Sequence, residues 1–145
     1  MALAARAPGG SVASPGDGAR GASSASLDHA AAVTRYAASF NDAVAAAAAA
    51  GADWPSDPLR VALAFLVLRG APDTTITRAD EGAEAATSTV VTVVELGFLD
   101  DSVAGLEQAV TLDLVDGVWR VSGYRGAWIC HRSPGMKVSF PGVCP

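Results

Sequence analysis

Two cysteines near the C-terminus, Cys130 and Cys144, have the widest choice of chemistry of any side chains in this 145-residue sequence. The thirteen residues between them include four turn-forming positions: Pro134, Gly135, Pro141 and Gly142. A turn-rich segment between two cysteines at a chain end favours a disulfide that ties the tail to the last strand, and a loop of this size gains about 3 kcal/mol from it. We therefore predict a Cys130–Cys144 disulfide, with two free, buried thiols as the plain alternative.

Two more reactive interpretations involve His131, which directly follows Cys130. A nucleophilic Cys130 would need His131 as its base, but neighbouring residues on a strand point to opposite faces of the sheet. A metal site made of Cys130, His131 and Cys144 lacks a fourth ligand and the close ligand pairs that zinc sites use. Both interpretations remain open, and the sequence favours neither.

The other titratable residues have simpler roles. His29 stands beside Asp28 at the start of a predicted helix, where adjacent side chains do not face each other. Five carboxylates, whose spacing does not match a calcium loop, fall in predicted solvated turns: Asp80, Glu81, Glu84, Asp100 and Asp101. The glycines form no phosphate-binding motif. We predict no catalytic residue, no metal site and no cofactor.

Large aromatic side chains are few, since Phe, Trp and Tyr make up 6% of the chain. We expect most of them to meet between helices and sheet, where the simplest role is core packing. The alternative is an apolar pocket with Tyr36 or Tyr124 as its polar group, because a curved sheet covered by helices often leaves a cleft. The candidate pocket residues are Tyr36, Phe40, Trp54, Phe65, Trp119, Tyr124 and Trp128.

Charge and hydropathy restrict the partners. A net charge of −5 and a pI near 4.8, with scattered Lys and Arg, argue against a nucleic-acid surface. The apolar run Val61–Leu68 is too short to span a membrane and predicts a buried helix. Arg6, Pro8 and Gly9 interrupt any apolar export signal at the N-terminus. We expect no nucleic acid and no membrane span, and the oligomeric state stays open.

The order of elements predicts an α+β fold. Residues 1–24, rich in Ala, Gly, Ser and Pro, predict a disordered tail or linker, and residues 25–145 a single domain. Apolar residues at helical spacing predict a helix capped by Ser26 and ended by Gly51, then a second helix from Asp57 and Pro58 to Gly70. Segments 74–78, 87–98, 107–115 and 118–131 predict a curved antiparallel meander of three to four strands under both helices. Residues 80–86 predict an acidic turn.

The hairpin around Asp116 and Gly117 fixes a register. A two-residue turn there pairs Leu114 with Trp119 and Leu112 with Val121, so all four of these side chains face the helices. The later aromatic residues, Tyr124 and Trp128, have the opposite parity. We therefore predict a bulge near Gly123 or Gly126.

The hairpin segment D-G-V-W-R-V, residues 116–121, resembles the final hairpin of the nuclear transport factor two-like superfamily of cone-shaped α+β (cystatin-like) proteins. The C-terminal segment from Trp128 resembles small actinobacterial secreted or membrane-anchored domains that end with Trp-x-Cys, a Gly-containing turn, an aromatic residue and a last Cys. Those domains often carry Arg-Gly-His in the turn, and only Gly135 matches. Isomerases and dehydratases of the superfamily use an acid or His base inside the cone, and the sequence presents no clear counterpart.

Three functional hypotheses follow. The first is a non-catalytic extracytoplasmic domain, in the cell envelope or secreted, that binds a partner protein or a small apolar ligand; the cysteine pair and the missing catalytic groups favour it. The second is a small enzyme of the cone-shaped fold, of the isomerase or dehydratase type, acting in an apolar cleft. The third is a cytoplasmic accessory or assembly protein with reduced cysteines, which the absence of an export signal favours.

Overall fold

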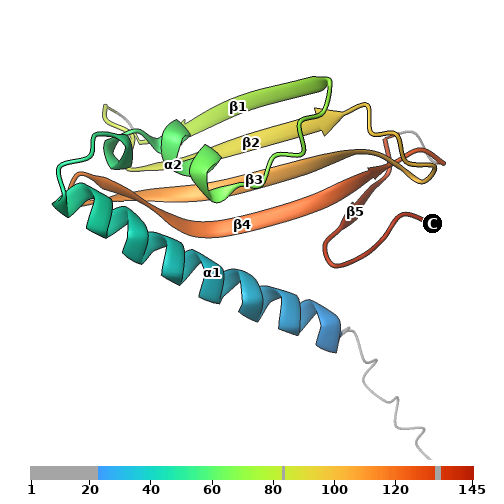
Figure 1. The fold of residues 1–145 in the computed structure, drawn as a ribbon, viewed down its shortest axis with the longest axis horizontal. Coiled ribbons are helices and arrows are strands. Elements are labelled where there is room, and N and C mark those ends of the chain that lie inside the picture. The colour runs from blue at the N-terminus through green and yellow to red at the C-terminus, as the bar shows by residue number, and fades with distance from the viewer. Residues whose placement is uncertain (1–22, 83, 133–134) are drawn as a thin grey trace, which may run out of the picture.

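The chain folds as two α-helices followed by an open antiparallel sheet (Figure 1). The structure, a computed structural model, describes residues 23–82, 84–132 and 135–145. In chain order the elements are α1 (Ser24–Ala49), the 3-10 turn η1 (Trp54–Ser56), α2 (Pro58–Phe65), β1 (Asp73–Glu81), β2 (Ser88–Leu96), β3 (Val103–Val115), β4 (Val118–Cys130) and β5 (Lys137–Ser139). The strands follow one another in the order β1-β2-β3-β4-β5. The predicted α+β meander is confirmed.

The sheet has five strands, so the prediction of three to four strands was wrong. The additional strand is β5, which pairs with β4 over three residue pairs within the C-terminal tail. Three residues are too few for composition to indicate a strand. In addition, β1 extends through Asp80 to Glu81 as the partner of β2, where an acidic turn was predicted.

The helix ends are set by capping side chains. Ser23, rather than the predicted Ser26, caps α1 by accepting a hydrogen bond from the backbone N–H of Ser26. Ser24 is thus already helical, although the prediction placed it in the tail; residues 1–22 of that tail lie outside the described residues. Asp57 caps α2 as predicted, and Pro58 occupies its first turn. That helix ends at Phe65, and residues 66–72 form an extended linker that we call the strap.

The hairpin register is confirmed. Leu114 pairs with Trp119 and Leu112 with Val121, and both turn residues adopt a positive φ, as a two-residue turn of this type requires. The register shifts where Thr111 pairs with Gly123, which leaves Ser122 as the extra residue of a bulge. Because of this bulge, Tyr124 and Trp128 share the inner face of the sheet with Trp119.

Asn41 of α1 joins the helix to β4 at the bulge. Its side-chain amide donates to the carbonyl oxygen of Val121 and accepts from the N–H of the same residue, both at 2.9 Å. These two backbone groups would otherwise face the helix without a partner at the point where strand pairing is irregular. The Asn41 side chain thus provides hydrogen bonds to the backbone at the bulge and joins α1 to the sheet.

The inner face of the sheet is packed against both helices at one end of the molecule. Figure 1 shows α1 running along the β4 side and α2 lying across the sheet near β2 and β3. We call this packed region the closed end. Its buried residues include Val44, Val61, Phe65, Val91, Val110, Leu112, Trp119 and Val121. None of the helices in the described ranges combines the length and apolar character needed to cross a bilayer.

Candidate functional site

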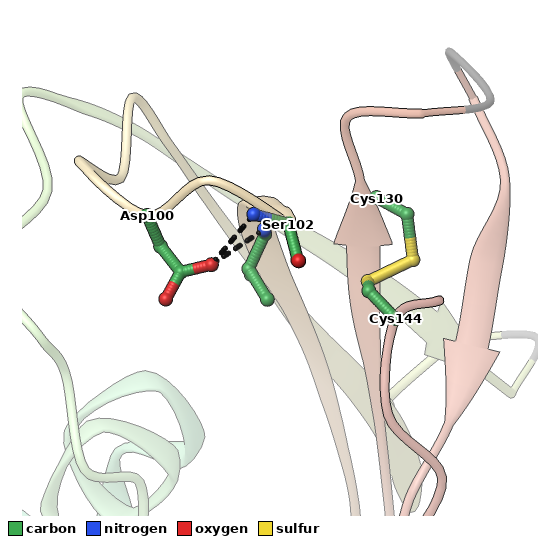
Figure 2. Close-up of a disulfide and its surroundings, with 5 residues drawn as sticks. Asp100, Ser102, Cys130 and Cys144 are labelled. Atoms are coloured by element: carbon green, nitrogen blue, oxygen red, sulfur yellow. Dashed lines mark hydrogen bonds between the residues drawn. A yellow bond between two sulfur atoms is a disulfide. The ribbon is translucent and has the colours of Figure 1, made fainter.

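The two cysteines form a disulfide that joins the end of β4 to the C-terminal tail, as predicted (Figure 2). Cys130 is 2% exposed, and the Cα atoms of the two residues are 5.5 Å apart. Because both sulfurs are bonded to each other, neither is available as a nucleophile or as a metal ligand in this state. His131 is exposed just beyond the bond. Ser133 and Pro134, in the loop that the bond closes, lie outside the described residues.

A cleft of about 370 Å³ opens between α1, the strap and the inner face of the sheet. Its volume is within the range of small-molecule sites. We call this region, together with the strap and the tail, the open end. The residues that line the cleft are His29, Ala32, Val33, Tyr36, Phe65, Leu66, Val67, Arg69, Leu106, Gln108, Tyr124 and Phe140.

The seven predicted pocket residues divide into three groups. Tyr36, Phe65 and Tyr124 line the cleft. Three others, Phe40, Trp54 and Trp119, pack in or against the core of the closed end, so for them the core-packing interpretation fits. Trp128 lines a second cleft on the other side of Arg69 and contacts Phe140, at 5.0 Å between ring centroids. The aromatic residues therefore fill one end of the inner face and border a space at the other.

The strap forms one wall of the cleft and is held by side chains of the sheet. Glu95 Oε1 accepts hydrogen bonds from the backbone N–H groups of Arg69, at 2.8 Å, and Ala71, at 3.3 Å. Gln108 Nε2 donates to the carbonyl oxygen of Val67 at 3.3 Å. These bonds satisfy strap backbone groups that do not pair with a strand, while Val67 itself stays 72% exposed.

Glu95 is the residue whose role the sequence analysis missed. It is 1% exposed and lies on the inner face, opposite Leu106 of β3, so the sequence-based view that no acid faces inward was wrong. Its second oxygen, Oε2, is buried and has no hydrogen-bond partner. The signal was the alternation along β2, since Glu95 continues the inward series of Val91 and Val93.

A short polar network crosses the floor of the cleft. The Tyr124 hydroxyl donates to Gln108 Oε1 at 3.0 Å, and the same amide reaches the strap through its nitrogen. Burial raises the pKa of the Tyr124 phenol, so it remains a neutral hydroxyl at physiological pH. The oxygen of Tyr124 can still accept a hydrogen bond from a bound molecule.

Phe140 brings the disulfide-tied tail into the cleft. Its ring lies over Gly126, where an added Cβ would collide with a ring carbon, and edge-on to His29 with the ring centroids 6.0 Å apart. The backbone N–H of Phe140 donates to the carbonyl oxygen of Gly126 at 3.0 Å. Gly126 of β4 has no side chain and therefore leaves room for the Phe140 ring, which forms a wall of the cleft.

The second cleft, of about 610 Å³, lies between the β2–β3 loop and the tail, and Arg69 lines both clefts. Asp100, on its border, accepts hydrogen bonds from the backbone N–H groups of Ser102 and Val103 at 2.8 and 2.9 Å (Figure 2). These bonds hold the pKa of the Asp100 carboxyl below its usual range. Within the described ranges, His, Cys, Asp and Glu side chains form no group that could hold a metal ion.

No known protein family, curated protein or solved structure matches this chain.

Proposed function

We propose that this chain is an extracytoplasmic domain that binds a small, largely apolar ligand in the cleft at the open end. The observation that carries the proposal is the cleft itself: about 370 Å³ of space between apolar walls, with hydrogen-bonding groups of Tyr124 and Gln108 on its floor. Small-molecule sites combine an apolar lining with a few fixed polar groups in this way.

The walls of the cleft are built so that the space stays open. Glu95 and Gln108 hold the strap by its backbone, and the disulfide and β5 hold the tail that carries Phe140. A site formed by held elements loses little conformational freedom when a ligand enters, which favours binding. This support favours a ligand site over the partner-protein alternative, which would need an exposed surface rather than a recess.

The location and the fold relationship belong to the same proposal. A disulfide between Cys130 and Cys144 fits an oxidising compartment, which supports a secreted or envelope-attached domain. Two helices on the inner face of an antiparallel sheet, with Trp119 beside an Asp-Gly turn, support a relationship to the nuclear transport factor two-like superfamily.

An enzymatic role is less well supported by the geometry. Glu95, the buried acid of the inner face, is bonded to the strap backbone and does not line the cleft. His29 does line it, and the structure gives the imidazole a ring contact with Phe140 rather than a hydrogen bond to an acid among the described residues. Among the residues that the structure describes, His29 is therefore not aligned by an acid, as a base in acid–base catalysis commonly is.

A cleft-filling substitution tests the binding proposal. Ala32 is exposed on α1 and lines the cleft, so Ala32→Trp places an indole in the space without disturbing the core. The uncharged fluorescent probe N-phenylnaphthylamine should bind the oxidised wild-type chain at one molecule per chain. Its affinity should fall at least about tenfold in Ala32→Trp, a loss of about 1.4 kcal/mol of binding free energy.

The matched control is Ala31→Trp, because Ala31 is the neighbouring exposed alanine and does not line the cleft. This variant should bind the probe as the wild type does. Equal binding by Ala32→Trp and the wild type, or no saturable binding by the wild type, would contradict the proposal.

A further inference from the structure

The charge of the cleft points to the kind of ligand. Among the described residues that line it, Arg69 is the one with a permanent charge, and neither Asp nor Glu takes part in the lining. The other polar side chains of the lining are His29, Gln108 and the two tyrosines, and each of them can donate a hydrogen bond. An apolar space with one fixed cation at its border suits a molecule with an apolar body and one negative charge.

Arg69 is positioned for this role. Its backbone N–H is fixed by Glu95, and its guanidinium lies over the ring of Trp128, with Cζ 5.4 Å from the ring centroid. The N–H groups of a guanidinium can bind a carboxylate in a bidentate manner. Among the described residues no carboxylate lies within ion-pair distance of Arg69.

Two acidic side chains, Glu95 and Asp100, could pair with the Arg69 guanidinium, but neither of them lines the cleft. Glu95 is buried behind the strap, where Oε1 already accepts two backbone N–H groups. Asp100 borders the second cleft, on the other side of Arg69, and binds the backbone of its own loop. The net charge of −5 opposes any anion at long range, but at physiological salt this repulsion is screened beyond about 8 Å.

We propose that the ligand is a small apolar monocarboxylate, of the aliphatic or aromatic type. Its carboxylate binds the guanidinium edge of Arg69, and its apolar body lies against Phe65, Leu106 and Phe140. A single cation selects a single negative charge, because a phosphate monoester or dicarboxylate would leave a second charge unpaired in an apolar space. This inference rests on the proposed function, since it names the ligand class of the same cleft.

The test compares two probes that share one apolar chain, octanoate and octanol, by calorimetric titration of the oxidised, full-length protein. Octanoate should bind about tenfold more tightly than octanol, as expected for a charge-assisted contact. Arg69→Gln should remove this preference and leave octanol affinity unchanged. Arg69→Lys keeps the charge without the bidentate geometry, so it should keep only part of the preference.

Arg125→Gln is the control, because Arg125 is exposed, does not line the cleft, and its replacement changes the net charge by the same amount. It should preserve the octanoate preference. If octanol and octanoate bind equally well to the wild type, or if Arg125→Gln weakens octanoate as much as Arg69→Gln does, the carboxylate inference is wrong and the apolar cleft remains. If neither these probes nor N-phenylnaphthylamine binds, the proposed function and the inference both fail.

Discussion

The space between the helices and the inner face of the sheet is filled at one end and open at the other. At the closed end, apolar side chains fill the space between helices and sheet, with Val44, Val61 and Leu112 fully buried. At the open end, the backbone of the strap and of the tail is held by Glu95, Gln108 and the disulfide, and the space between them remains. Filling a space stabilises a fold, whereas holding its walls apart preserves a cavity, and this difference distinguishes the candidate site from the core.

The largest expected change in the free energy of unfolding is at the closed end. Trp119 is 5% exposed in the core, so Trp119→Ala should lower the free energy of unfolding by about 3–5 kcal/mol, as loss of a large buried aromatic side chain does. Phe140→Ala, at the half-buried wall of the open end, should cost less than half as much and should weaken N-phenylnaphthylamine binding. Urea denaturation measures both. Equal losses of stability would show that the two ends are packed alike.

Removal of the disulfide tests how the tail is held. The double variant Cys130→Ser, Cys144→Ser should lower the free energy of unfolding by about 3 kcal/mol, because the unfolded chain regains the freedom of the closed loop. Urea denaturation of the wild type in reductant should give the same loss, and reductant should leave the double variant unchanged. A wild type whose stability does not respond to reductant would show that β5 alone anchors the tail.

Glu95 tests how the strap is held. Glu95→Ala removes the acceptor of two backbone N–H groups, so the free energy of unfolding should fall by about 2 kcal/mol. Hydrogen exchange should accelerate at the amides of Arg69 and Ala71 more than elsewhere. Glu95→Gln is the matched control, because it keeps an oxygen at the acceptor position and should retain most of the protection. Similar exchange in both variants would mean that the negative charge, rather than the acceptor, holds the strap.

The smallest effect concerns the loop beside the second cleft. The pKa of Asp100 is lowered in the folded chain, so its contribution to stability is present above the unfolded pKa and is lost as the pH falls through the folded pKa. A carboxyl carbon NMR titration should therefore place the Asp100 midpoint below the usual range of an Asp carboxyl. Asp100→Asn should reduce the acid sensitivity of the Ser102 and Val103 amides. A midpoint within the usual range of an Asp carboxyl would show that the loop bonds do not persist in solution.

The sequence predicted those parts of the fold that local patterns determine. The Asp116–Gly117 turn set the register of β3 and β4, and parity alone required a bulge near Gly123 or Gly126, the first of which is next to the observed one. Asp57 and Pro58 marked the start of α2, and the spacing of the cysteines indicated the disulfide. In each case the signal lies within about fifteen residues, a range over which chain geometry is restrictive.

The open end depended on contacts between distant segments. The strap amides and their acceptor Glu95 are about 26 residues apart, and Asn41 and Val121 are 80 residues apart. No local pattern pairs such groups, because they meet only after the helices have packed on the sheet. Seven aromatic residues were proposed for the pocket, and three of them line it, since aromatic character alone does not distinguish a core from a cleft wall.

The bulge at Ser122 makes the open end sensitive to the register of β4 as well as to its side chains. If β4 instead paired regularly with β3 through this exposed residue, Ser122 would lie opposite Thr111, and every residue beyond it would turn to the other face. Tyr124 would leave the cleft, and Cys130 would turn away from the tail that it holds. The extra residue in β4 thus decides which side chains reach the cleft, whereas deletion of Ser122 itself would leave Tyr124 opposite Val110 on the inner face.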